Sequence, residues 1–85
     1  MKINVRQVYT KQITQGRKRI ETIDYRLCGF FSQDVVRWVE GEIKDTTEIY
    51  FSNSSAIVAL SKYEEFDAIM SEAYAEDNSP PFFAN

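Results

Sequence analysis

The stretch INVRQVYTKQITQGRKRIETIDYRLCGFF, residues 3–31, decides the fold of this chain. Alternate positions in its first part are apolar, namely Ile3, Val5, Tyr9 and Ile13. This period of two is typical of a strand with one partly buried face. Gly16 follows, and glycine supplies the positive φ that a tight hairpin turn needs. The stretch therefore predicts a long N-terminal β-hairpin.

The second arm of this hairpin runs from about residue 19 to residue 31. One of its faces is apolar, at Ile23, Tyr25, Leu27 and Phe31. From Leu27 to Phe31 the other face is apolar as well, a pattern typical of strands that are buried on both sides. We therefore expect this end of the arm to be central in the sheet and covered on both faces.

Residues 32–43 fit two local structures. As a helix, the segment has a capping residue in Ser32 and an apolar face formed by Val35, Val36, Val39 and Ile43. The β-branched and aromatic side chains and the interruption at Gly41 favour a strand instead. We interpret the segment as a strand between turns at 32–34 and 44–46, with the helix as the alternative.

The second half of the chain predicts a hairpin and a helix. Residues 48–51 and 56–60 form the hairpin, because four turn-forming residues separate them. Ser61 and Glu64 have the spacing of a capping box, and a core-facing set follows them: Phe66, Ile69, Met70 and Ala73.

These elements predict an α+β fold. We expect an antiparallel sheet of four to five strands, built from the long N-terminal hairpin and the second hairpin, with one C-terminal helix packed on it. Residues 1–78 form a single α+β domain in this interpretation, since 85 residues leave no room for a second core. Residues 79–85 form an extended C-terminal tail because Pro80 and Pro81 exclude a helix there.

Charge is unevenly distributed along the chain. Residues 1–44 contain nine Lys and Arg against five Asp and Glu, whereas residues 45–85 contain one against eight. The chain has no His and a single Cys, which removes the commonest catalytic and metal-binding groups. We therefore expect a binding protein that is not an enzyme and holds neither cofactor nor metal.

Cysteine usage bears on the compartment. Cys28 has hydrophobic neighbours and no second cysteine to pair with, so we expect an inert core thiol in a reducing environment. We also expect no membrane association, because the longest purely apolar run is far shorter than a membrane span. These features favour the cytoplasm, or the host cytoplasm if the chain is encoded by a phage.

Basic residues gather on the N-terminal hairpin. The candidate nucleic-acid-binding residues are Lys11, Arg17, Lys18, Arg19 and Arg26. A cationic β-ribbon suits a nucleic-acid groove, and Tyr9, Tyr25, Phe30 and Trp38 are candidate stacking partners. The alternative is a hairpin apex whose cations only contact water, which fits the acidic isoelectric point of about 4.9.

Acidic residues gather on the predicted helix. Carboxylates on one helix face can imitate phosphates and occupy a basic groove of another protein. The alternative is a solvated helix face. The candidate partner-binding residues are Glu64, Glu65, Asp67 and Glu72 on the helix, together with Arg17, Lys18 and Arg19 on the hairpin.

The segment from Glu76 to Phe83, EDNSPPFF, resembles the acidic Pro-Phe tips of single-stranded-DNA-binding proteins. In that family the tip docks partner enzymes and competes with nucleic acid for the basic groove. The chain departs from the pattern because Ala84 and Asn85 follow the aromatic residues and only two acids precede them. The alternative is that the phenylalanines fold back onto the domain's own core.

Two functional hypotheses result. In general character the chain looks like the small accessory proteins of phages and mobile elements, including inhibitors of host defence. The first hypothesis is accordingly a non-enzymatic protein that binds and inhibits or modulates a larger host protein or ribonucleoprotein. The second is a small nucleic-acid-binding protein that uses the basic hairpin and is regulated by its acidic tail. A monomer and a homodimer built through strand edges fit both.

Overall fold

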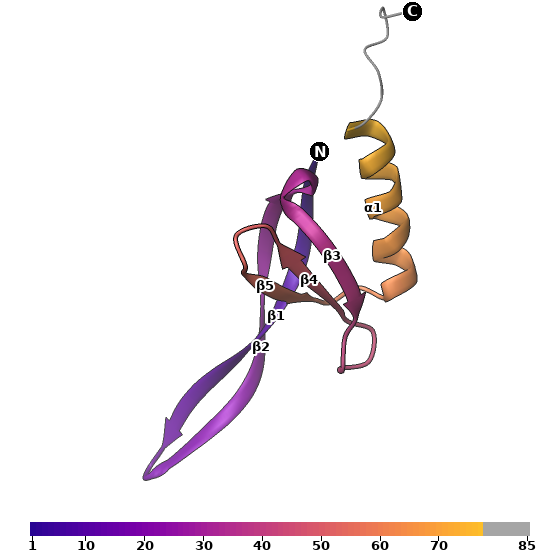
Figure 1. Ribbon diagram of the computed structural model, residues 1–85. Helices are drawn as coiled ribbons and strands as arrows, with labels where there is room; N and C mark the ends of the chain where they lie inside the picture. Colours follow the sequence, from indigo (N-terminus) through magenta and orange to yellow (C-terminus); the bar gives the residue numbers. More distant parts are fainter. Residues whose placement is uncertain (78–85) are drawn as a thin grey trace, which may run out of the picture.

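The computed structural model describes residues 1–77 (Figure 1) and confirms the α+β fold. The elements, in chain order, are β1 (Lys2–Gln15), β2 (Lys18–Phe31), a 3₁₀ turn η1 (Ser32–Asp34), β3 (Val35–Glu40), β4 (Thr47–Phe51), β5 (Ala56–Ala59) and α1 (Tyr63–Asp77). The five strands form one antiparallel sheet in the order β2-β1-β5-β4-β3. The expected tail at 79–85 lies outside the described residues.

The N-terminal hairpin is confirmed. β1 and β2 are 14 residues each and pair without a break from Lys2 opposite Phe31 to Gln15 opposite Lys18. Gly16 and Arg17 form the connection, and Gly16 takes the positive φ of 61° that favours glycine.

The expectation that the end of β2 is central and covered on both faces is wrong. β2 is an edge strand of the sheet. Phe30 points into the core, whereas Leu27 is 83% exposed and Phe31 54% exposed. Leu27 and Phe31 are therefore surface residues, and only the face of β2 that carries Phe30 contributes to the core.

Residues 32–43 adopt the strand interpretation. A single 3₁₀ turn at Ser32–Asp34 leads into β3, and the next turn includes Asp45 with a positive φ of 61°. Gly41 precedes this turn and donates its N–H to the carbonyl of Thr46. A Cβ on Gly41 would collide with the Thr46 side chain, so the sequence needs glycine here for space. The hairpin of β4 and β5 is likewise present where expected.

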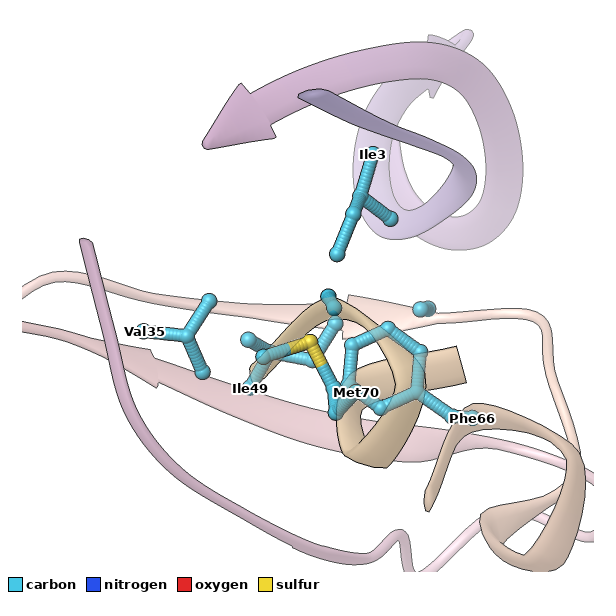
Figure 2. Packing of buried hydrophobic residues seen from close by; sticks show 7 residues of the cluster. Ile3, Val35, Ile49, Phe66 and Met70 are labelled. Carbon is cyan, nitrogen blue, oxygen red and sulfur yellow. The ribbon is translucent and has the colours of Figure 1, made fainter. Parts of the chain in front are cut away.

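The core lies between α1 and one face of the sheet (Figure 2). Phe66, Met70 and Ile49 are fully buried, and Ile3 and Val35 are nearly so. Aromatic rings complete the packing: Phe30 lies edge-on to Phe51 with centroids 5.1 Å apart, and Trp38 lies edge-on to Phe66 at 6.1 Å. Of the four helix residues expected in the core, Ile69 is the exception, because it is 42% exposed.

The expected capping box does not form at the start of α1. The helix begins at Tyr63, and the Ser61 hydroxyl donates to the carbonyl of Lys62 at 3.5 Å. The first helical backbone bond runs from the Phe66 N–H to the Lys62 carbonyl, so Lys62 occupies the capping position.

The C-terminal end of α1 is tied to the start of the sheet. The amino group of Met1 forms an ion pair with Asp77 at 2.9 Å, and the buried Ser32 hydroxyl donates to the other carboxylate oxygen. These bonds lower the pKa of Asp77, with the Ser32 hydroxyl as the largest cause. The helix in the described part of the chain is neither long nor apolar enough to cross a membrane.

Candidate nucleic-acid interface

The outer part of the hairpin is an arm that projects from the rest of the sheet (Figure 1). β1 pairs with β5 only at Gln7 and Val8. Beyond these positions, β1 and β2 pair only with each other. We define residues 9–24 as the arm, which a strand rise of about 3.4 Å per residue makes roughly 24 Å long.

Cations are concentrated on this arm. Lys11, Arg17, Lys18 and Arg19 are all exposed, and none pairs with a carboxylate of residues 1–77. The acids of the arm are Glu21 and Asp24, so the arm has an excess of positive charge. Arg17, Lys18 and Arg19 are therefore brought together at the tip, whereas Lys11 lies four residues before the end of β1, opposite Thr22. All four charged groups are in solvent.

Arg26, the fifth basic candidate, lies at the root of the arm and is engaged. Its guanidinium lies 4.9 Å from the centre of the Tyr9 ring, and its Nε donates to the Gln7 side chain at 3.0 Å. The Tyr9 hydroxyl donates in turn to Asp24 at 3.3 Å. These contacts brace the two strands where the arm leaves the sheet, so Arg26 stiffens the arm.

Most of the predicted stacking residues are not available. Phe30 packs in the core, Trp38 is packed against Phe66 and Tyr74, and Tyr9 lies under the Arg26 guanidinium. Tyr25 is 50% exposed and remains a candidate. Sequence parity could separate Phe30 from Tyr25 into opposite faces of β2, but it could not say which face the helix covers.

The tip also carries an apolar pair. Ile13 and Ile20 are opposite each other in the ladder, close to the cations, and opposed residues of an antiparallel pair lie on the same face. Ile20 is 37% exposed. The tip thus presents a small apolar contact beside the positive charges of Arg17, Lys18 and Arg19.

The four acidic candidates on α1 do not form one set. Glu64, Glu65 and Glu72 are exposed. Asp67 lies partly buried on the flank facing β3, where it accepts the indole N–H of Trp38 at 3.0 Å. The acidic face available to a partner therefore consists of Glu64, Glu65 and Glu72, which are separated from the cationic tip by the body of the sheet.

Sequence reasoning missed a hollow on the sheet face opposite α1. It has a volume of about 490 Å³, and its lining includes Val8, Ile23, Tyr50 and Val58. The Tyr50 hydroxyl donates to Glu48 at 3.0 Å, and this bond is the largest cause of the raised pKa of Tyr50. Glu48 and Tyr50 are two residues apart on a short strand, so the sequence indicates that they lie on the same face of the sheet. It gives no sign that this face is hollowed.

Two other site types have little support in the described residues. No group of three or more His, Cys, Asp or Glu among residues 1–77 is placed to hold a metal ion. Cys28 is half-buried, which corrects the expectation of a core thiol, and it lies beside a hollow bordered by Lys2 and Phe31.

Comparison with known proteins gives no match among family models, curated proteins or solved structures.

Proposed function

We propose that this protein is a non-enzymatic nucleic-acid-binding protein whose arm contacts the phosphate backbone. The observation that supports this most directly is the set of exposed cations on a projecting β-ribbon, with Arg17, Lys18 and Arg19 at its tip and Lys11 along β1. A two-stranded ribbon fits the major groove of a duplex, about 12 Å wide. Cations that hold no carboxylate can neutralise phosphates and release the counterions that these carry.

The acidic isoelectric point does not oppose this proposal, because the charges are separated in space. The acids of α1 lie on the body, whereas Arg17, Lys18 and Arg19 lie about 24 Å along the arm from its root. At 0.1 M salt, interactions between exposed charges fade over about 10 Å. A phosphate at the tip therefore experiences the local excess of positive charge, while the acidic body faces away.

The composition of the tip predicts sequence-independent binding. Arginine and lysine at the turn suit phosphates, and Ile20 with Ile13 offers an apolar contact that can press on bases in a groove. Specificity for a base sequence would need a larger set of side chains aimed at base edges. We expect the affinity for duplexes of different sequence to agree within a few fold.

Fluorescence anisotropy with a labelled duplex and a labelled single strand tests this proposal. We expect saturable binding at 50 mM salt that weakens by at least tenfold at 200 mM, as neutralisation of three to four phosphates requires. The triple variant Arg17→Glu/Lys18→Glu/Arg19→Glu should abolish binding.

A matched control changes cations away from the arm. Lys44→Glu/Lys62→Glu alters two exposed lysines on the body, and binding should stay within about threefold of wild type. Absence of binding at 50 mM salt, or equal losses in both variants, would exclude the arm as the nucleic-acid contact.

A second candidate function is supported by the acidic face of α1. Glu64, Glu65 and Glu72 are exposed and form no ion pair with residues 1–77, so they can contact a basic groove of a larger protein and inhibit it by imitating phosphates. A phage or mobile-element inhibitor of host defence belongs to this class. For a partner identified by affinity capture, Glu64→Lys/Glu65→Lys/Glu72→Lys should weaken binding at least tenfold, and unchanged affinity would exclude this face.

A further inference from the structure

The outer edge of β2 is long and open. β2 forms one end of the sheet and pairs with β1 alone among the described strands. Proteins usually protect such an edge by making it short, charged or bulged. β2 is 14 residues long, pairs with β1 without a bulge and exposes apolar side chains on one face, with Ile23 52%, Tyr25 50% and Leu27 83% exposed.

The backbone hydrogen bonds show which residues of β2 direct their N–H and C=O groups toward this edge. At the end of the hairpin, the Ser32 N–H donates to the Met1 carbonyl. Hydrogen-bonded pairs alternate along an antiparallel ladder, so the backbone groups of even-numbered residues in β2 point toward β1. The backbone N–H and C=O groups of odd-numbered residues, including Ile23, Tyr25 and Leu27, therefore point to the open edge. Consistently, the Tyr25 N–H does not bond to β1 and is held by the side chain of Asp24 at 2.8 Å.

We propose that two copies of this chain pair their β2 strands antiparallel, about a two-fold axis that passes through Tyr25. The backbone groups of odd-numbered residues point to the open edge, so a ladder forms only where odd-numbered residues of the two copies are opposite each other. This condition holds when the two-fold axis passes through a residue and fails when it passes between two residues. With Tyr25 at the centre, Asp24 lies opposite Arg26 of the other copy. Ile23 likewise lies opposite Leu27 of the other copy, and each of these pairs occurs twice.

The neighbouring registers are less complementary. An axis through Asp24 places two aspartates opposite each other, and an axis through Arg26 does the same with two arginines. An axis through Ile23 leaves Asp24 opposite Thr22, and one through Leu27 leaves Arg26 opposite Cys28. Like charges opposite each other destabilise a sheet and opposite charges stabilise it, so the Tyr25 register is favoured.

A second copy suits this edge better than a different protein because the strand is complementary to itself: Asp24 meets Arg26, and apolar Ile23 meets apolar Leu27. In the dimer, the Tyr25 carbonyl of the other copy replaces Asp24 as the acceptor of the Tyr25 N–H. This frees Oδ1 of Asp24 to meet Arg26 of the other copy, while Oδ2 still accepts from the Tyr9 hydroxyl. The arms point in opposite directions, and a rise of about 3.4 Å per residue places the two cationic tips about 54 Å apart. The dimer does not depend on nucleic-acid binding.

Sedimentation velocity and charge exchange test the register. We expect wild type to shift from monomer to dimer as its concentration rises. Asp24→Arg places arginine opposite arginine and should weaken the dimer at least tenfold, as should Arg26→Asp, which places aspartate opposite aspartate. The double variant Asp24→Arg/Arg26→Asp restores opposite charges and should recover dimerisation. A monomer at every concentration up to 1 mM, or a double variant no better than the single ones, would overturn the proposal.

Disulfide trapping gives an independent measurement of the same register. In a Cys28→Ser background, Tyr25→Cys places two cysteines opposite each other, with Cα atoms about 5.5 Å apart, which is within disulfide range. The matched control is Glu21→Cys. In this register residue 21 is opposite residue 29 of the other copy, so the two cysteines are eight residues, or about 27 Å, apart. We expect covalent dimer only from Tyr25→Cys, and equal yields from the two variants would exclude the register.

Discussion

Trp38 on β3 donates its indole N–H to the Asp67 carboxylate on α1 across 3.0 Å. The same tryptophan packs edge-on against Phe66 and tilts against Tyr74 at 5.7 Å, so one side chain joins the strand edge to the helix through both an apolar and a polar contact. Asp67 therefore serves the fold, although it belongs by charge to the acidic set of the helix.

Removing this carboxylate should destabilise the protein. Asp67→Ala leaves a partly buried indole N–H without its acceptor, and a hydrogen bond to a charged group contributes about 1.5–3 kcal/mol. We expect a loss of about 1–2 kcal/mol in urea unfolding, because the site is partly open to water. Glu64→Ala, on the exposed side of the same helix, is the control and should change stability by less than about 0.5 kcal/mol. Equal losses would show that Asp67 contributes only through helix charge.

Asp77 makes stability depend on pH in the acid range. Its pKa is lowered in the folded protein by the Ser32 hydroxyl and by the amino terminus, from an ordinary value of 3.8. A group whose folded pKa is depressed stabilises the fold above its unfolded pKa, and this contribution disappears as the pH falls through the folded pKa. Asp77→Asn should therefore lower the Tm at pH 7 and bring the two proteins closer together below pH 3.

Thermal unfolding monitored by circular dichroism between pH 2 and pH 7 measures this difference. The control is Glu76→Gln, which changes an adjacent exposed carboxylate on α1. Its Tm should change with pH in the same way as that of wild type. A Tm difference between Asp77→Asn and wild type that stays constant down to pH 2 would contradict the assigned role of the carboxylate.

Gly41 should not tolerate a side chain. A Cβ at this position meets the side chain and the backbone of Thr46, which is 1% exposed and donates its hydroxyl to the Ile43 carbonyl at 2.5 Å. Because part of the obstruction is backbone, relief requires the turn to shift, and we expect Gly41→Ala to cost about 1–3 kcal/mol. Glu42→Ala, one residue later, should be nearly neutral in the same urea titration. A neutral Gly41→Ala would show that the turn adapts freely.

Much of the fold follows from local sequence patterns, because the period-two alternation of Ile3 to Ile13 and the glycine at 16 are local signals. The position of β2 at the edge of the sheet is not local, since it depends on β5 pairing with β1. Parity shows that Leu27 and Phe30 lie on opposite faces, but only the position of α1 decides which face is buried.

The candidate site was predictable where it depends on local sequence signals. The tip cations follow from the hairpin turn, because a turn places its neighbours in solvent. Charge alone could not separate Asp67 and Asp77 from the exposed acids of the helix. The partner of Asp67 is Trp38, and those of Asp77 are Ser32 and Met1, all of them distant in sequence. Ile69 has core spacing, yet it is 42% exposed, because the spacing of apolar residues along a helix does not say how far the neighbouring sheet extends.

The two faces of β2 should respond differently to truncation. Phe30→Ala removes a ring that packs against Phe51 and lies 6.4 Å from Phe66, and loss of a half-buried aromatic of this kind costs about 2–4 kcal/mol. Leu27→Ala removes a side chain that is 83% exposed and should cost less than about 0.5 kcal/mol in dilute protein, where the chain is monomeric. At high concentration the same Leu27 variant should lose dimer, since it removes the side chain that Ile23 of the other copy meets. Comparing urea unfolding at low and high protein concentration separates these two effects, and a large loss from Leu27→Ala in the monomer would mean that this face of β2 is covered by its own chain.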